Sequence, residues 1–251
     1  MRKNIAISER SQIAILWSFV VFAVIYGLAL GFLLRMIPPP AATQTAEQIK
    51  DWYLSRQTGI KLGAMVASWT SAFMVPFWAV VAMQMSRQEK GRPIWTSLTL
   101  VSGALISIFL VLPPIFFGAA AFTPTRAPEV TAIMHQLGVL TLVTTDQYFI
   151  FSFIAVVVFC FLPTRADHSP FPRWFGYFTI WFTLMGEAGA VAFNFATGPF
   201  AWNGLLAFWI PFGVFGPWLV MFVYLLLRAL KRQVRDAEMH DEQPQGDKLS
   251  V

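Results

Sequence analysis

Six long apolar runs, separated by short polar segments, dominate this chain. Each run holds about 20 residues or more, which lets a helix rising 1.5 Å per residue cross a hydrocarbon core about 30 Å thick. The chain has 251 residues, of which 57% are hydrophobic and only 12% are charged. In soluble domains about a quarter of the residues are charged. The low share here predicts an integral membrane protein.

The expected fold class is all-α, a polytopic bundle of six transmembrane helices in a single domain over residues 1–229. The polar composition of the remaining residues, 230–251, is typical of a disordered tail. The six expected spans are 12–36, 60–85, 94–121, 145–163, 174–197 and 204–229.

Lysine and arginine are distributed unevenly over the predicted loops. With the N-terminus inside, 13 of the 18 basic residues fall on the inner side. The basic residues that fall outside are Arg35, Lys50, Arg56, Lys61 and Arg126. Because cytoplasmic loops carry the excess of basic residues, we expect a multi-pass protein of the cell inner (plasma) membrane with both termini in the cytoplasm. Anionic lipids of the inner leaflet account for the basic clusters, so membrane lipids are expected partners and nucleic acid is not.

Two outer segments are expected to form short helices of their own. In "TAEQIKDWYLSRQ", Thr45 and Gln48 have the spacing of a capping box, and Trp52 and Tyr53 fall on one helical face. The second segment, "APEVTAIMHQLGVLTLVTTD", is too short to span and either lies on the surface or dips into the membrane. Together the two segments predict an outer cap, whose candidate residues are Trp52, Tyr53, His135 and Asp146.

Residue patterns for common membrane catalysts are missing from the sequence. The chain has three histidines and one cysteine, Cys160, and none of the histidines falls in a predicted span. Metal, haem and nucleophile-base sites need such residues close together, and no phosphate-binding glycine motif is present either. We therefore expect no cofactor, no metal site and no catalytic residue.

Glu187 is the one acidic residue expected deep in a span. It lies ten residues from the outer turn at Thr197, about 15 Å down and close to the bilayer midplane. A charge at that depth costs about 2.5–3.5 kcal/mol on insertion scales, so Glu187 should face protein or water. At about 100° per residue, Thr183 and Asn194 lie within about 40° and 20° of Glu187 and form a polar stripe with it.

Two interpretations of Glu187 remain open. An intramembrane carboxyl is a functional-site hypothesis by default, and a substrate or proton path would use Glu187 with Asn194, Thr183, Ser68 and Ser71. Alternatively, Glu187 is a neutral side chain that hydrogen-bonds across helices and holds them together.

Prolines interrupt several of the predicted helices. Pro113 and Pro114 are adjacent in the third span, and Pro217 lies in the sixth. Each proline removes a backbone hydrogen bond and leaves a carbonyl that a neighbouring group must satisfy.

The stretches "FPRWFGY" and "TGPFAWNGLLAFWIP" resemble segments of uncharacterised bacterial six-helix integral membrane proteins. The resemblance covers mainly residues 128–229 and implies a topology of six spans, without an activity.

The function expected from these features is non-catalytic. With 25 Phe and 10 Trp, the bundle suits an apolar ligand. The protein would then bind or help to move a hydrophobic or lipid-like molecule, or serve as the membrane subunit of a larger complex with other membrane subunits. One alternative is a proton-coupled transporter that uses Glu187, and another is a membrane enzyme or redox subunit whose cofactor lies in a partner.

Overall fold

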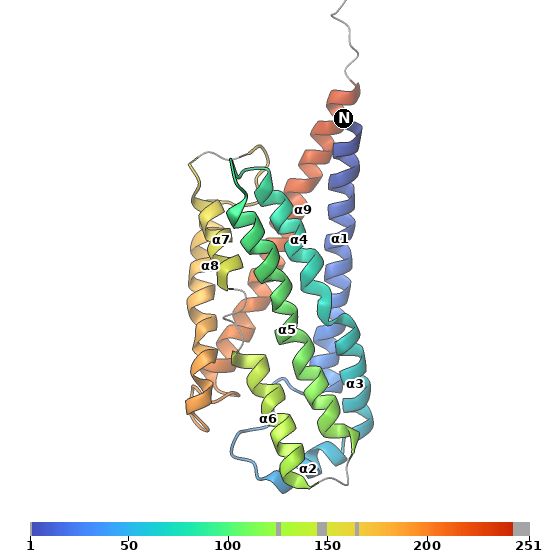
Figure 1. Ribbon diagram of the computed structural model, residues 1–251, viewed down its shortest axis with the longest axis vertical. Helices are drawn as coiled ribbons and strands as arrows, with labels where there is room; N and C mark the ends of the chain where they lie inside the picture. The colour runs from blue at the N-terminus through green and yellow to red at the C-terminus, as the bar shows by residue number, and fades with distance from the viewer. Residues whose placement is uncertain (1, 124–126, 145–149, 164–165, 243–251) are drawn as a thin grey trace, which may run out of the picture.

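A computed structural model of the protein describes residues 2–123, 127–144, 150–163 and 166–242. Throughout these ranges the regular elements are helices, and they pack into an elongated bundle (Figure 1). The fold is therefore all-helical, as the sequence predicts.

The two ends of the bundle differ. The beginning of α1 (Arg2–Leu28) and the end of α9 (Ile210–Glu242) lie together at one end, which we call the terminal end. The short helix α2 (Ala46–Leu54) lies at the opposite end, which we call the α2 end.

The remaining helices fill the space between these ends. Several helices continue directly into short segments of 3₁₀ or π geometry, labelled η. The elements are η1 (Ala29–Leu33), α3 (Gln57–Thr70), η2 (Ser71–Phe73), α4 (Met74–Ser86), α5 (Ile94–Phe122), α6 (Pro128–Thr144), α7 (Ile150–Phe161), α8 (Arg173–Gly186), η4 (Glu187–Asn194) and η5 (Leu205–Trp209).

Four helices in the described part of the chain are long and apolar enough to cross a membrane. They cover Ser8–Leu33, Gln57–Ser86, Ile94–Phe122 and Leu205–Met239. These helices indicate a membrane protein, and they coincide with the expected first, second, third and sixth spans. The expected fourth span, 145–163, lies partly outside the described residues.

The surface of the bundle is apolar where that of a soluble protein would be polar. On α6, for example, Ile133 is 52% exposed while His135 is 1% exposed. On α8, Leu184 is exposed while Thr179 is buried. Such an inverted pattern suits a surface that meets lipid, because lipid tails are as apolar as leucine and buried polar groups then bond across helices.

The two short outer helices form where the sequence predicts them. Thr45 and Gln48 exchange the two capping-box hydrogen bonds at the start of α2, at 2.9 and 3.3 Å. The second segment becomes α6, whose first turn carries Glu129. Both helices lie in the half of the bundle at the α2 end (Figure 1).

The proline pair in α5 leaves a backbone carbonyl that α1 satisfies. Pro114 has no N–H, so the carbonyl of Leu110, four residues earlier, lacks its helical partner. The hydroxyl of Tyr26 donates to that carbonyl at 2.8 Å. The expectation that a neighbouring group satisfies the freed carbonyl is confirmed at this position.

Close helix packing around an aromatic core stabilises the terminal half. Trp78 of α4 packs against Gly103 of α5, where a Cβ atom would lie 2.4 Å from the Trp78 side chain. Trp218 of α9 is fully buried and donates from Nε1 to the hydroxyl of Thr179 at 3.0 Å. These contacts join α4 to α5 and α8 to α9, and the rings of Trp78 and Trp218, 6.4 Å apart, join α4 to α9.

α9 extends further than the sequence suggests. Residues 230–242 were expected to begin a disordered tail, but they are helical. The physical reason is that this extension packs: Leu230 and Gln233 are buried, and Glu238 forms an ion pair with Arg10 of α1. Residues 243–251 lie outside the described residues.

Candidate functional site

A cavity of about 480 Å³ lies between α1, α5, α8 and α9. Its wall is almost entirely apolar and contains seven phenylalanine rings. The polar side chains in the wall are Tyr26, Thr183 and Glu187. The cavity therefore holds the residue that the sequence singled out.

All four described segments of irregular helix contribute to the wall of this cavity. Leu30 comes from the π segment η1, and Phe73 comes from the 3₁₀ segment η2. Glu187 begins the 3₁₀ segment η4, and Phe208 belongs to the π segment η5. Regular helices pack side chain against side chain, whereas irregular turns interrupt that packing and are frequent at functional sites.

Among the polar side chains of the wall, Glu187 is the one that has no partner in the described part of the chain. The Tyr26 hydroxyl is committed to the Leu110 carbonyl, and the Thr183 hydroxyl donates to the Thr179 carbonyl at 2.8 Å. Within the described part of the chain, the Glu187 carboxyl makes neither a hydrogen bond nor an ion pair. A cross-helix bond from Glu187, one of the two interpretations left open by the sequence, does not occur among the described residues.

A close backbone approach fixes η4, and with it Glu187. A Cβ atom at Gly189 would lie 2.0 Å from the backbone carbonyl oxygen of Val143 in α6. Only glycine lets η4 lie so near the end of α6. This contact holds the first turn of η4, and therefore Glu187, against the cavity.

The predicted polar stripe is only partly formed. Thr183 and Glu187 both line the cavity, one helical turn apart. Asn194 is exposed and is not part of the wall. The reason is that η4 is a 3₁₀ helix with about 120° per residue instead of 100°, which turns Asn194 about 120° away from Glu187.

Ser68 and Ser71 lie away from this site. They belong to the junction of α3 and η2, where the Ser71 hydroxyl donates to the Ser68 carbonyl at 2.8 Å. Neither serine lines the cavity, although Phe73 of the same junction does. The structure thus does not bring the two serines to Glu187.

The cavity has an open edge between α1 and α9. The two helices meet at the terminal end and separate farther down the bundle (Figure 1). Gly27 of α1 and Gly216 of α9 line the cavity, are exposed, and have no atom within 4 Å of a Cβ built on them. The small size of these residues leaves an opening on the surface that faces lipid.

The outer-cap residues do come together around His135. The Tyr53 hydroxyl lies 3.1 Å from His135 Nδ1, with donor and acceptor set by the imidazole tautomer. The rings of Trp52 and Trp202 lie 6.4 and 6.1 Å from the His135 ring. Burial raises the pKa of the Tyr53 hydroxyl. Asp146 lies outside the described residues.

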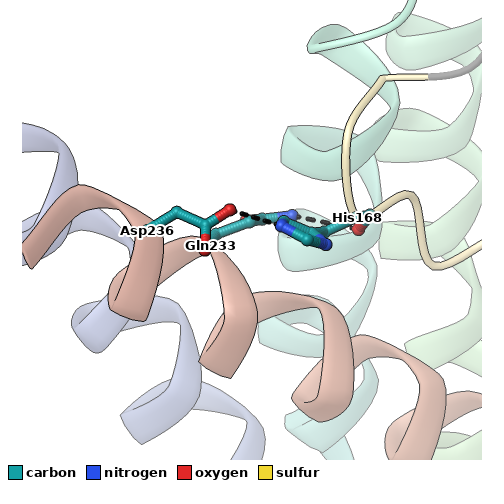
Figure 2. Close-up of polar contacts among 3 residues, drawn as sticks. All are labelled: His168, Gln233 and Asp236. Carbon is teal, nitrogen blue, oxygen red and sulfur yellow. Dashed lines mark hydrogen bonds and ion pairs between the residues drawn. The ribbon is translucent and has the colours of Figure 1, made fainter. Parts of the chain in front are cut away.

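Buried amides tie the helices together at the terminal end. Gln84 of α4 donates to Gln12 of α1 at 2.9 Å, and Gln233 of α9 donates to Gln84 at 3.0 Å. Gln233 also donates to the His168 carbonyl at 3.3 Å, and the His168 ring contacts Asp236 at 2.5 Å (Figure 2). Gln12, Gln84 and Gln233 are therefore paired with one another across three helices.

Several of these residues were not foreseen from the sequence. Gln84 is a polar residue in an apolar run, which is a usable signal, but its partners come from helices far apart in the chain. Gly27 and Gly216 carry no such signal, because a single sequence does not reveal a cavity beside them. Among the described residues, no group of three or more His, Cys, Asp or Glu side chains could hold a metal ion.

Comparisons with known proteins yield no match, whether the chain is compared with family models, with curated proteins or with solved structures. The resemblance to bacterial six-helix membrane proteins therefore stays a prediction. Any functional interpretation rests on the geometry of the site itself.

Proposed function

We propose that this chain is a non-catalytic membrane protein that binds a hydrophobic or lipid-like molecule in the cavity beside Glu187. The observation that carries the proposal is the cavity of about 480 Å³ with its largely aromatic and aliphatic wall. Pockets for small ligands commonly measure about 300–1,000 Å³ and are lined by apolar side chains with a few polar groups. The cavity has both properties.

The proposal places the chain in the membrane with six crossings and with both termini in the cytoplasm. Besides the four long helices, α8 and η4 form a continuous segment of about 37 Å, at about 1.5 and 2.0 Å per residue. α6 and α7, which follow one another along the bundle (Figure 1), would supply the remaining crossing. The excess of basic residues on the inner side supports a plasma-membrane location.

The ligand would enter from the bilayer through the opening between α1 and α9. A molecule dissolved in lipid reaches Gly27 and Gly216 without crossing water, and both glycines are exposed. Lipid alone suffices to cover the other exposed apolar faces. Further membrane subunits on those faces are a compatible extension of the proposal.

A second candidate is proton-coupled transport through Glu187, favoured by a carboxyl that has no partner among the described residues. It would need polar groups that lead from Glu187 to both surfaces. Because Ser68, Ser71 and Asn194 do not line the cavity, ligand binding is the better supported function.

Two leucine substitutions on one helix test the proposal. Gly216→Leu adds a side chain at a residue that lines the cavity, whereas Gly213→Leu adds the same side chain at an open position of α9 outside its wall. Purified proteins are incubated with dodecyl alcohol, and native mass spectrometry measures the bound fraction. Gly27→Leu, which adds a side chain at a lining residue of α1, is a second cavity-filling variant.

We expect Gly216→Leu and Gly27→Leu to weaken binding at least about tenfold, which corresponds to about 1.4 kcal/mol. Gly213→Leu should bind as the unmodified protein does. If the cavity-filling variants keep full binding while all proteins remain folded, the cavity is not the binding site and the proposal is wrong.

A further inference from the structure

We infer that the molecule bound in the cavity is a cationic amphiphile, an apolar body with one amine-like group that donates hydrogen bonds to Glu187 and Thr183. This inference rests on the proposed ligand-binding function and adds the chemical class of the ligand. It follows from which polar atoms of the wall remain available.

The cavity offers acceptors to a ligand. The Tyr26 hydroxyl gives its proton to Leu110, and the Thr183 hydroxyl gives its proton to Thr179, at 2.8 Å each. The oxygen of Thr183 still has lone pairs, and an ionised carboxylate accepts only. A ligand that satisfies these atoms while the carboxyl is ionised must therefore bring its own N–H or O–H groups.

The cavity also lacks a positive charge. No lysine, arginine or histidine lines its wall, and the Glu187 carboxyl has no ion-pair partner in the described part of the chain. A charge removed from water is stable only when it is paired. A cation carried by the ligand supplies that pair, whereas a fatty acid or a phosphate head group would add a second negative charge.

The aromatic wall suits the same ligand. Phe182 of α8 and Phe215 of α9 are two of the seven phenylalanine residues that line the cavity, and their ring centroids lie 5.9 Å apart. Ring faces attract cations within about 6 Å, with energies that increase when water is excluded. The remainder of the wall is apolar and accommodates the body of the amphiphile.

The position of the polar pair sets the orientation of the ligand. Thr183 and Glu187 lie one turn apart on the continuous α8 and η4 segment. The opening at Gly27 and Gly216 is formed by α1 and α9 instead. The amine would therefore bind at the α8 wall, with the apolar body extending toward the opening and the lipid.

Three probes with the same alkyl chain test the inference: dodecylamine, dodecyl alcohol and dodecanoate. Native mass spectrometry measures their binding to the full chain and to the variants Glu187→Gln, Thr183→Val and Gly216→Leu. Glu129→Gln, which removes an exposed carboxyl on α6, controls for unspecific attraction of the amine to acidic residues.

We expect the unmodified protein to prefer dodecylamine over dodecanoate at least about tenfold, which corresponds to about 1.4 kcal/mol. Glu187→Gln should reduce that preference to about threefold or less without weakening dodecyl alcohol, and Glu129→Gln should leave it unchanged. Thr183→Val should weaken amine and alcohol a few-fold, because it removes an acceptor.

The outcomes separate the two proposals. If Gly216→Leu removes binding of every probe but Glu187→Gln keeps the amine preference, or if the unmodified protein shows no such preference, the cationic-ligand inference is wrong and the binding cavity stands. If Gly216→Leu binds all probes normally, the proposed function itself fails.

Discussion

The terminal end and the central cavity both place polar side chains among apolar helices, but Gln84 at the terminal end is paired, whereas Glu187 in the cavity has no partner among the described residues. Gln84 is 1% exposed and is hydrogen-bonded to amides of α1 and α9. Glu187 makes no hydrogen bond or ion pair with any described residue. Paired amides stabilise helix association, whereas an unpaired carboxyl contributes nothing to it. The difference supports the proposal that Gln84 serves the fold and that Glu187 serves a ligand.

The largest effect is expected at the terminal end. Gln84→Met keeps the length of the side chain but leaves Gln12 and Gln233 without their amide partner. Each buried group that loses its partner costs about 1–3 kcal/mol, so we expect the free energy of unfolding to fall by about 2–4 kcal/mol. Unfolding by denaturant in detergent micelles measures the change. Gln136→Met, at an exposed position of α6, is the control and should change stability by less than about 0.5 kcal/mol.

The next largest effect is expected where η4 lies against α6, beside the cavity. Gly189→Ala places a Cβ atom against the Val143 carbonyl, so η4 and α6 must move apart. Overpacking of this kind costs about 1–3 kcal/mol. Gly213→Ala, at an open position of α9, should instead gain up to about 1 kcal/mol from helix propensity. Equal stabilities for the two variants would contradict the close approach of η4 to α6.

A smaller effect concerns Glu89, which caps α5 at the terminal end. Its carboxylate accepts hydrogen bonds from the backbone N–H groups of Trp95 and Thr96, at 2.9 Å each, and from the Thr96 hydroxyl at 2.7 Å. Desolvation by burial opposes these bonds, but the bonds prevail and lower the pKa of Glu89 below its usual value of 4.5. The carboxylate therefore contributes stability that is complete above the ordinary carboxyl pKa and is lost as the pH falls through the lowered pKa.

Glu89→Gln should accordingly reduce stability at neutral pH by about 0.5–1 kcal/mol, the range of a helix cap. The difference from the unmodified protein should shrink as the pH falls through the lowered pKa of Glu89, since the carboxylate becomes protonated there. Unfolding curves across the acidic range give this difference. A gap that stays constant down to the lowest pH would show that the carboxylate is not the stabilising form.

The features that could be predicted from the sequence are those with local signals. Helix positions follow from the apolar runs, and the α2 cap follows from Thr45 and Gln48, because both signals are local. The position of Glu187 on an inner face follows from the cost of a charge in lipid. Asn194 was misplaced because the sequence carries no sign that η4 adopts 3₁₀ geometry after Gly186.

Contacts between helices that are distant in the chain could not be predicted from the sequence. The wall of the cavity includes residues of four irregular segments, and each of them comes from a different part of the chain. The Gln84 network likewise joins α1, α4 and α9. A pattern within one helix shows that a polar residue faces inward, but it does not show whether another helix supplies a hydrogen-bonding partner for it.

The most direct test of the account is the stability of ligand-free Glu187→Met, measured beside Gln84→Met. If Glu187 is kept for a ligand, replacing its unpaired carboxyl with an apolar side chain should leave the free energy of unfolding unchanged or raise it by about 1 kcal/mol. Gln84→Met should lower it under the same conditions. A loss of more than about 1 kcal/mol in Glu187→Met would mean that the carboxyl stabilises the fold, and it would contradict the central claim.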